Sequence, residues 1–405
     1  MNIRCVGPLL YLALLLPALS LPARGIDLAE SVRLSVERHP RFPLHRALSK
    51  VGEGYRRQAD SLLGGDPSAN LSVAGDPLGT DFGYREYTLG ASLPLWLPGQ
   101  RDARRRIADG LENQAGMELL NLTWEVSGEV LDRAWRVRIA RARVRQALKQ
   151  WASARALEKD VTHRFNAGEL TRIDMLLARQ DVIASEVVHQ EAVSDRQRAR
   201  LAWFNYTGQQ ALPEGLDSFV TAADPPELAR HPRLLAALAK AGIARAKAGD
   251  TRLRRRAPPV ISIYAKRDRG ARSEAYTDSL GIELSLPFGS RAQAAPAIAE
   301  AEAESTGAES EAALVKRQLE LRIASAEEAV LKAERLLVLA RRKHQASRAR
   351  LKLSQRAFEL GEMDLYQLLL ARQQAALASR DLEIRQLEKQ HAMAQKTHST
   401  GVIPQ

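Results

Sequence analysis

Cysteine is almost absent from this sequence. The 405 residues contain one cysteine, Cys5, which lies inside an apolar run near the N-terminus. It has no partner for a disulfide, and it is not at the end of that run, where a lipid-attachment cysteine would be expected. The rest of the chain therefore has no thiol chemistry.

Long hydrophobic runs are also missing after the first residues. Arg4 precedes the apolar residues 6–19, and Leu21-Pro22-Ala23 follows them, which is the layout of a secretory signal. A membrane anchor is the alternative, but the run is shorter than the ~20 residues that a spanning helix needs, and Pro8 and Pro17 interrupt it. We predict a signal peptide over residues 1–23, and therefore export. No later stretch approaches ~18 continuous apolar residues, so any membrane-spanning part must use strands.

Acidic residues are fewer than basic ones. The chain has 60 Lys and Arg against 48 Asp and Glu, a net charge of +12. Such a balance suits a nucleic-acid binder, and Arg252, Arg254, Arg255 and Arg256 resemble a phosphate patch. The basic residues are nevertheless spread among many acidic ones, and no aromatic-rich recognition motif accompanies them. We predict no nucleic-acid partner.

Proline is absent from two long stretches, between Pro98 and Pro213 and between Pro296 and Pro404, which suits long uninterrupted helices. A heptad seam marks both stretches, with apolar residues at alternating spacings of four and three. The seam comprises Leu319, Ile323, Ala326, Val330, Ala333, Leu337 and Ala340, and 193 residues earlier Val126, Val130, Arg133, Val137, Ala140, Val144 and Ala147. We predict helices packed side by side, the first over about residues 101–165 and on the order of 100 Å long.

The sequence repeats four landmarks in the same order, about 193 residues apart. They are Arg38-His39-Pro40-Arg41 and Arg230-His231-Pro232-Arg233, Ser92-Leu93-Pro94-Leu95 and Ser285-Leu286-Pro287-Phe288, Phe165-Asn166-Ala167-Gly168-Glu169 and Phe358-Glu359-Leu360-Gly361-Glu362, and Leu176-Leu177-Ala178-Arg179-Gln180 and Leu369-Leu370-Ala371-Arg372-Gln373. Such a period indicates a duplicated structural unit. We predict a first repeat at residues 24–212, a second at 213–398 and a tail at 399–405.

Each repeat contains a pair of strands. Residues 86–95 and 279–288 alternate between apolar and polar side chains, and weaker strands precede them at residues 71–74 and 260–264. The loops between, at 76–84 and 267–278, are rich in Gly, Asp and Arg and are typical of hairpin ends. Four strands are too few for a sandwich or for a closed membrane barrel, which starts at about eight. Several chains must therefore share a barrel, and the spacing leaves open whether two or three do so.

The other elements complete the repeat. A helix is predicted before each strand pair, at residues 28–63 and 226–248, and a helical hairpin after it. Gly168 and Gly361 suit left-handed turns, and Thr171 and Asp364 can cap the returning helices. A soluble rod of coiled coils is the alternative, but it leaves the apolar strand faces unexplained.

These motifs together resemble the TolC family of outer-membrane efflux proteins over nearly the whole chain. The first turn motif is Arg164-Phe165-Asn166-Ala167-Gly168-Glu169 with Ile173-Asp174-Met175-Leu176, and the second is Phe358-Glu359-Leu360-Gly361-Glu362 with Leu365-Tyr366-Gln367-Leu368-Leu369. The resemblance implies an α+β membrane protein. In it three chains share a transmembrane β-barrel, four strands each, continued by a long α-helical barrel through the periplasm.

The paired Arg-His-Pro segments further resemble the CzcC-like heavy-metal branch of that family. The resemblance to the TolC family as a whole implies an outer-membrane homotrimer in contact with lipid. A proton-driven inner-membrane pump would deliver cargo to it through a periplasmic adaptor. Metal cations and organic compounds remain open as cargo.

The resemblance also implies where such a channel would act. The helical turns would form a periplasmic tip that docks the adaptor, at positions Gly168, Glu169, Leu170, Gly361, Glu362 and Met363. Some relatives narrow the tip with carboxylates six and nine residues after the second glycine, but this chain has Gln367 and Leu370 there. The candidates for a pore constriction are Asp174, Asp364 and Gln367, with helix capping as the alternative for Asp174.

Catalytic chemistry is not indicated. The eight histidines are scattered, and His39 and His231, each before a proline, are better explained as helix boundaries than as metal ligands. No catalytic triad, phosphate loop or paired catalytic carboxylate stands out. We therefore predict no enzymatic activity, no cofactor and no metal site. The predicted function is a passive exit duct, with a soluble periplasmic scaffold or adaptor as the alternative.

Overall fold

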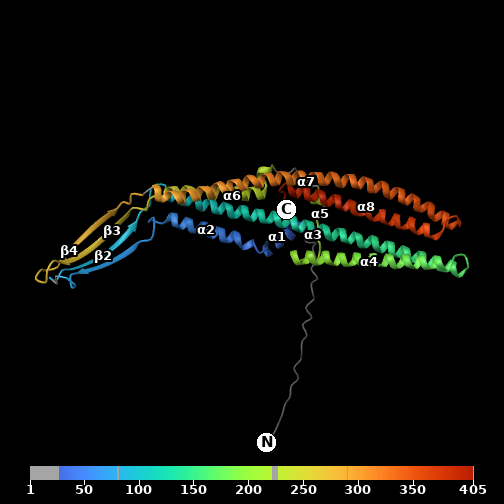
Figure 1. Ribbon diagram of the computed structural model, residues 1–405, viewed down its shortest axis with the longest axis horizontal. Coiled ribbons are helices and arrows are strands. Elements are labelled where there is room, and N and C mark those ends of the chain that lie inside the picture. Colours follow the sequence, from blue (N-terminus) through green and yellow to red (C-terminus); the bar gives the residue numbers. More distant parts are fainter. Residues whose placement is uncertain (1–26, 80–81, 221–226, 290, 405) are drawn as a thin grey trace, which may run out of the picture.

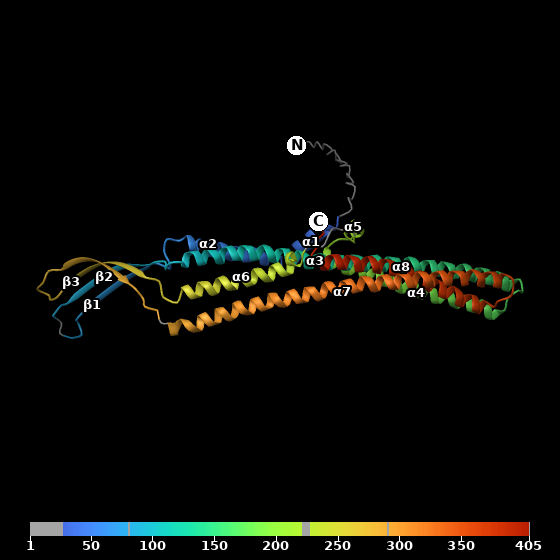
Figure 2. The ribbon, with the colours of Figure 1, turned by 90° about the horizontal axis from the view of Figure 1, so that it is seen from above.

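The chain forms a long, narrow body with a small sheet at one end and two tight helical turns at the other (Figures 1 and 2). The structure is a computed structural model that describes residues 27–79, 82–220, 227–289 and 291–404, so the predicted signal peptide lies outside the described residues. The elements in chain order are α1 (Leu28–Arg38), α2 (Phe42–Asp60), β1 (Ser68–Gly75), β2 (Arg85–Pro94), α3 (Gln100–Asn166), α4 (Arg172–Thr207), α5 (Leu216–Val220), η1 (Leu228–Arg230), α6 (Pro232–Leu253), β3 (Val260–Arg269), β4 (Thr277–Ser285), α7 (Arg291–Glu359) and α8 (Leu365–Ser399).

Two very long helices, α3 and α7, span the helical body. They contain 67 and 69 residues, and at ~1.5 Å per residue each is on the order of 100 Å long. The prediction of a long helix over about residues 101–165 is confirmed. Helix α2 packs on the sheet-side part of α3, and α4 packs on the turn-side part (Figure 1).

Helix α3 forms the core of the molecule. It packs against α1, α2, α4, α6 and α8, whereas α7 packs against α6 and α8. All five tryptophans lie before residue 204, and Trp124, Trp135 and Trp203 are fully buried. The predicted seam of α3 is buried apart from Arg133, but in α7 only Leu319, Leu337 and Ala340 are buried.

The helix predicted over residues 28–63 is in fact two helices, which corrects that prediction. The break lies at His39, which has extended φ and ψ of −70° and 133° because the following Pro40 disfavours helical geometry. The helix predicted at 226–248 likewise begins only at Pro232, after η1, and continues to Leu253. His39 and His231 are confirmed as helix boundaries. The Nδ1 of each accepts a hydrogen bond of 3.2 Å from the backbone N–H two residues later.

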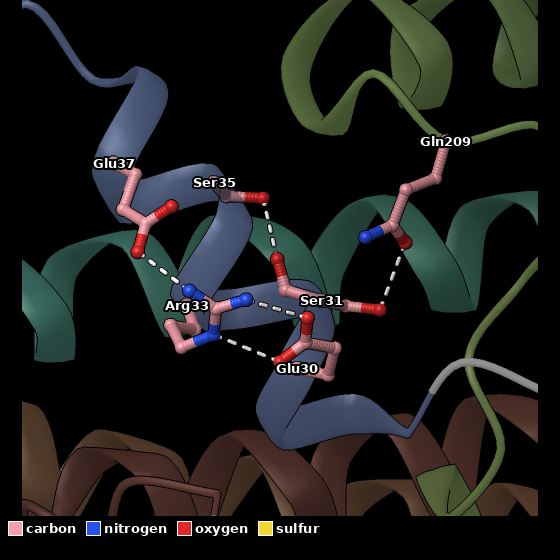
Figure 3. Close-up of polar contacts among 6 residues, drawn as sticks. All are labelled: Glu30, Ser31, Arg33, Ser35, Glu37 and Gln209. Carbon is pink, nitrogen blue, oxygen red and sulfur yellow. Dashed lines mark hydrogen bonds and ion pairs between the residues drawn. The ribbon is translucent and has the colours of Figure 1, made fainter.

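Polar side chains tie α1 to the loop after α4 (Figure 3). The Ser31 hydroxyl donates to Gln209 Oε1 at 2.8 Å, and both residues are buried. Arg33 donates to Glu30 and to Glu37 on the exposed side of the same helix. The short helix α1 is thereby fixed beside the middle of α3.

The four strands form one antiparallel sheet in the order β1-β2-β3-β4. The pairing of β2 with β3 joins the two halves of the sequence. Strand β4 ends at Ser285, three residues before the predicted end, and β3 runs on to Arg269 through the first residues of the predicted loop. The periodic pattern continues past Ser285, but the strand pairing does not.

Candidate functional site

The two helical turns share one backbone motif. Gly168 and Gly361 have φ of 81° and 76°, in the left-handed region that glycine enters without strain. Three hydrogen bonds recur in both turns. They are Ala167 N–H to His163 O, Gly168 N–H to Phe165 O and Glu169 N–H to Arg164 O, and then Leu360 N–H to Arg356 O, Gly361 N–H to Phe358 O and Glu362 N–H to Ala357 O. This Schellman arrangement satisfies the last carbonyls of α3 and α7.

Each returning helix begins with a side-chain cap, as predicted. Thr171 and Asp174 form a capping box, in which the Asp174 carboxylate accepts from the Thr171 N–H at 2.9 Å and from its hydroxyl at 2.6 Å. Asp364 caps α8, since its carboxylate accepts from the Gln367 N–H at 2.7 Å. Both carboxylates are therefore held at the turn end of the molecule.

An apolar cluster beneath the turns binds the two hairpins to each other. Its buried members come from α3, α4, α7 and α8 and are Leu157, Val161, Ala178, Phe358, Leu365 and Leu368. Leu170 packs against this cluster, and the Arg164 guanidinium lies 5.5 Å from the Phe358 ring centre. The two turns consequently end the molecule side by side (Figures 1 and 2).

The sheet separates apolar from polar side chains by face. Strand register places the same-facing residues of neighbouring strands in rows. Three rows are entirely apolar: Leu71, Leu89, Ala265 and Leu280; Ala69, Ala91, Ile263 and Ile282; and Leu93, Ile261 and Leu284. Leu71, Leu89, Leu280 and Ile282 are 60% to 85% exposed, and no described helix packs across this face.

The opposite face of the sheet is polar. Ser92 lies 2.9 Å from Ser262 across the β2–β3 pair, and Lys266 forms an ion pair of 2.8 Å with Glu86. The ring of Tyr264 occupies the space beside Gly281, where any side chain would collide with it. Each strand thus has one face suited to lipid and one suited to water.

A cavity of about 750 Å³ lies midway along the helical body. Its lining includes Glu129 and Asp132 from α3, Arg322 from α7, and His391 and His398 from α8. The Nε2 of His391 is 3.3 Å from Asp132 Oδ1, and this contact lowers the pKa of the Asp132 carboxyl. The cavity therefore brings acidic and basic groups from distant parts of the chain together.

Trp124 organises one wall of this cavity. His398 stacks on its indole at 4.9 Å and 4°, His231 meets it edge-on at 4.7 Å, and the Arg322 guanidinium lies 4.9 Å from the ring. The indole N–H donates to the His398 carbonyl at 2.9 Å. Burial lowers the pKa of both histidines to about 4, with a smaller effect from Arg322, so both are neutral at pH 7.

The chain is similar in sequence to a curated protein and in structure to several solved outer-membrane proteins. No protein-family model matches it. It is 28% identical over 218 residues to the cobalt-zinc-cadmium resistance protein CzcC of Cupriavidus metallidurans, and the match spans about half the length of each, 52%. The outer-membrane channel OprN aligns with a TM-score of 0.71 at 20% identity, covering 92% of this chain and 89% of that chain. The outer membrane protein VceC from Vibrio cholerae also has a TM-score of 0.71, at 14% identity, covering 92% and 96%.

This chain has the fold of the TolC family of outer-membrane efflux channels. The resemblance read from the turn motifs is thereby confirmed. OprN is described as an outer-membrane channel and VceC as an outer membrane protein, and the absence of enzymatic activity in this chain stays a prediction.

Within this TolC-like fold, the predicted site residues gather at the turn end. Glu169 and Glu362 are exposed there, while Leu170 and Met363 are half-buried. Asp174, Asp364 and Gln367 lie at the starts of α4 and α8 and take part in capping. Their roles in docking and in constriction stay predictions.

The sequence did not reveal the cluster of Trp124, His231, His398 and Arg322, which we call the Trp124 cluster. His231 and His398 are 167 residues apart, and His398 is 274 residues from Trp124. No local sequence pattern could therefore indicate that these side chains are in contact. Two of the histidines that are scattered in the sequence, His231 and His398, lie together against Trp124 in the structure. The described residues nevertheless include no group of three or more His, Cys, Asp or Glu arranged to hold a metal ion. Among the described helices, none has a segment both long and apolar enough to cross a membrane.

Proposed function

We propose that this chain is the outer-membrane channel of a tripartite efflux system. Three copies would form a passive duct that receives cargo from a periplasmic adaptor and a proton-driven inner-membrane pump. The observation that carries the proposal is the sheet, with one apolar face that no described helix covers and two strand edges, on β1 and β4, that have no partner in the described part of the chain.

Both features are costly for a chain alone in water. An exposed apolar face of this size is unfavourable, and unpaired backbone groups at a sheet edge attract other strands. Lipid removes the first cost, and pairing of β1 with β4 of another copy removes the second. Four strands per chain give twelve in a trimer, the assembly implied by the TolC-like fold.

The helical body supports the same assembly. Helix α7 leaves one side uncovered, where Leu314, Leu321, Leu339 and Leu353 are exposed at separations of 7, 18 and 14 residues. At 3.6 residues per turn these separations return to the same side of the helix. A neighbouring copy would bury this side and close the helical barrel.

The orientation follows from the order of the elements. The hairpin loops and the helical turns are at opposite ends of the molecule (Figure 1). We place the sheet in the outer membrane and the helical body in the periplasm. The predicted export signal at residues 1–23 would fit this location. The turns would then face the adaptor, with Gly168, Glu169 and Leu170 and their counterparts Gly361, Glu362 and Met363 as the docking surface.

The candidate constriction lies at the same tip. Capping fixes the Asp174 and Asp364 carboxylates near the turns, so three copies would place two rings of acidic groups there, attractive to cations. Gln367 is neutral. The charge at this level would come from the helix caps rather than from the acidic positions of some relatives.

Heavy-metal cations are the cargo that the comparisons favour, because the relative CzcC is named for cobalt, zinc and cadmium resistance. Organic compounds are the alternative, since the chain supplies a wall rather than a binding pocket for its cargo. Survival of a deletion strain on cobalt, zinc and cadmium salts, compared with dyes and detergents, separates the two. A deletion strain that is sensitive to the organic compounds but not to the metal salts would rule out metal cations as the cargo.

The competing class is a soluble periplasmic scaffold or adaptor. An outer-membrane channel is expected to remain in the membrane fraction until detergent is added and to migrate as a heat-sensitive trimer. Release of the full chain by osmotic shock, without detergent, would rule out the proposed location.

A further inference from the structure

Three arginines gather at the loop end of the apolar sheet face. In the register of β2 and β3, Arg85 lies directly opposite Arg269, and the next same-facing row contains Tyr87 opposite Arg267. These residues continue the rows of apolar side chains toward the hairpin loops. We call Arg85, Arg267 and Arg269 the arginine cluster.

The arginine cluster is electrostatically unfavourable by itself. Like charges directly opposite each other in a strand pair destabilise the sheet. Asp278, opposite Arg267, is the one acidic residue in these rows, and its carboxylate is 3.6 Å from the Arg267 Nε. Among the described residues, no carboxylate lies within ion-pair distance of Arg85 or Arg269. An anion from outside the chain would relieve this repulsion.

Aromatic rings hold two of the guanidinium groups. The Tyr276 ring centre is 5.1 Å from the Arg267 guanidinium and 5.0 Å from that of Arg269, and Tyr87 lies 6.4 Å from Tyr276. The Arg269 Nε–H donates to the Gly83 carbonyl at 3.2 Å, and the remaining N–H groups of a guanidinium on an aromatic face stay able to donate to a ligand. These N–H groups match the geometry of a phosphate group.

An apolar groove adjoins the arginine cluster. It has a volume of about 540 Å³, and its lining on the apolar face includes Leu71, Tyr87, Leu89, Arg267, Asp278 and Leu280. Arg267 therefore belongs both to the groove and to the cluster. A ligand with a phosphate group and an acyl chain would satisfy both at once.

We propose that the arginine cluster and this groove bind a phosphorylated, multiply acylated glycolipid of the outer leaflet. The inference rests on the proposed function, because the hairpin loops point away from the helical body and so lie at the outer leaflet if the body is periplasmic (Figure 1). The phosphates accept hydrogen bonds from the guanidinium groups, and an acyl chain lies along the apolar rows.

The sheet offers a matched control for charge. Lys266 is adjacent to Arg267 in sequence, but it points to the polar face and is paired with Glu86 at 2.8 Å. Lys266→Gln removes one positive charge from the same strand without touching the lipid face. Any effect of general charge would appear in this variant as well.

The test uses the full chain purified in detergent as its assembled oligomer. Bisphosphorylated lipid A, the same lipid after enzymatic removal of both phosphates, and phosphatidylglycerol are titrated, and bound lipid is counted by native mass spectrometry. The triple variant R85Q/R267Q/R269Q is expected to bind bisphosphorylated lipid A about tenfold or more weakly than the wild type, because charged hydrogen bonds to phosphate are lost. Wild type and Lys266→Gln are expected to bind it alike.

Three results would overturn the inference. They are equal lipid A binding by the triple variant, equal binding of the dephosphorylated lipid by the wild type, and equal binding of phosphatidylglycerol. If the wild type assembles in the membrane and still gives one of these results, the inference fails and the proposed function stands. If the wild type never enters the membrane fraction, the proposed function fails and the inference fails with it.

Discussion

At the scale of single residues, the Trp124 cluster shows what burial does to a titratable group. His231 and His398 are 0% and 4% exposed, and desolvation disfavours their charged forms. Neutral imidazole can stack on the indole beside Arg322, whereas imidazolium would add a positive charge next to a guanidinium. The packing between α3 and α8 therefore depends on the proton count of two rings.

We expect this cluster to make the protein acid-sensitive. Each histidine has a folded-state pKa of about 4, below the usual value of 6.5, so the unfolded chain binds more protons in this interval. Stability is fully present above pH 6.5 and falls as the pH is lowered toward 4. The melting temperature of wild type and His398→Gln, measured between pH 4 and 8, checks this.

The change of melting temperature with pH, rather than the melting temperature at any one pH, tests this prediction. His398→Gln removes one titrating group, so its melting temperature should depend less on pH whatever its value at pH 7. His163→Gln is the control, because His163 is exposed near the turn and lies outside the cluster. Parallel profiles for wild type and His398→Gln would contradict the prediction.

The turn glycines give a second prediction for single residues. Gly168 and Gly361 have positive φ, and no atom lies within 4 Å of the position that a Cβ would take at either residue, so strain alone opposes a side chain. Gly361→Ala should destabilise the protein by ~1 kcal/mol. Gly116→Ala, at an open position inside α3, should instead stabilise it by roughly 0.5–1 kcal/mol. Thermal unfolding of the two variants should shift in opposite directions.

At the scale of elements, sequence patterns located the helices and strands better than their ends. Gaps without proline identified α3 and most of α7, because an interior proline costs a helix hydrogen bonds, but α7 begins at Arg291 and so includes Pro296. The break at Pro40 was predicted only in part, since His39 was assigned to a helix boundary while a single helix was still predicted across it. The end of β4 was missed because alternation up to Phe288 persists where the pairing with β3 stops.

The sheet also contains a close contact between side chain and backbone that the alternation of apolar and polar residues does not indicate. Gly281 of β4 faces the ring of Tyr264 on β3, so the two residues form one complementary pair. Gly281→Val should destabilise the sheet by about 1–3 kcal/mol through overpacking. Removing the ring in Tyr264→Ala/Gly281→Val should recover part of the loss. The yield of membrane-assembled oligomer measures the effect, and an unchanged yield for Gly281→Val would refute it.

At the scale of the whole molecule, the two halves of the sequence differ in how much of their long helix is covered by other helices of the same chain. Helix α3 is surrounded by other helices, whereas α7 keeps the side with Leu321 and Leu339 open. This difference could not be read from the seams, which have the same spacing in both halves. Burial depends on position in the assembly, and a single sequence does not state which helix lies at a subunit boundary.

We expect the open side of α7 to control oligomerisation. Leu321→Glu/Leu339→Glu places two carboxylates on that side, and burying them against a second copy would be strongly unfavourable. The variant should run as a monomer in size-exclusion chromatography with light scattering. Gln345→Glu, an exposed residue on another side of α7, is the control and should keep the oligomer. A trimeric double variant would show that this side is not an interface.

If several copies share a barrel as proposed, the edges of β1 and β4, which have no strand partner among the described residues, would also set the order of events in biogenesis. A single copy would present two rows of free N–H and C=O groups, and these would pair with whichever strand arrives first. Correct closure of the proposed barrel would then require identical chains to meet, so its rate would rise steeply with their local concentration, while mispairing would compete at every encounter. Clustered insertion of newly made copies, rather than the speed at which one chain folds, would decide how many working ducts a cell obtains.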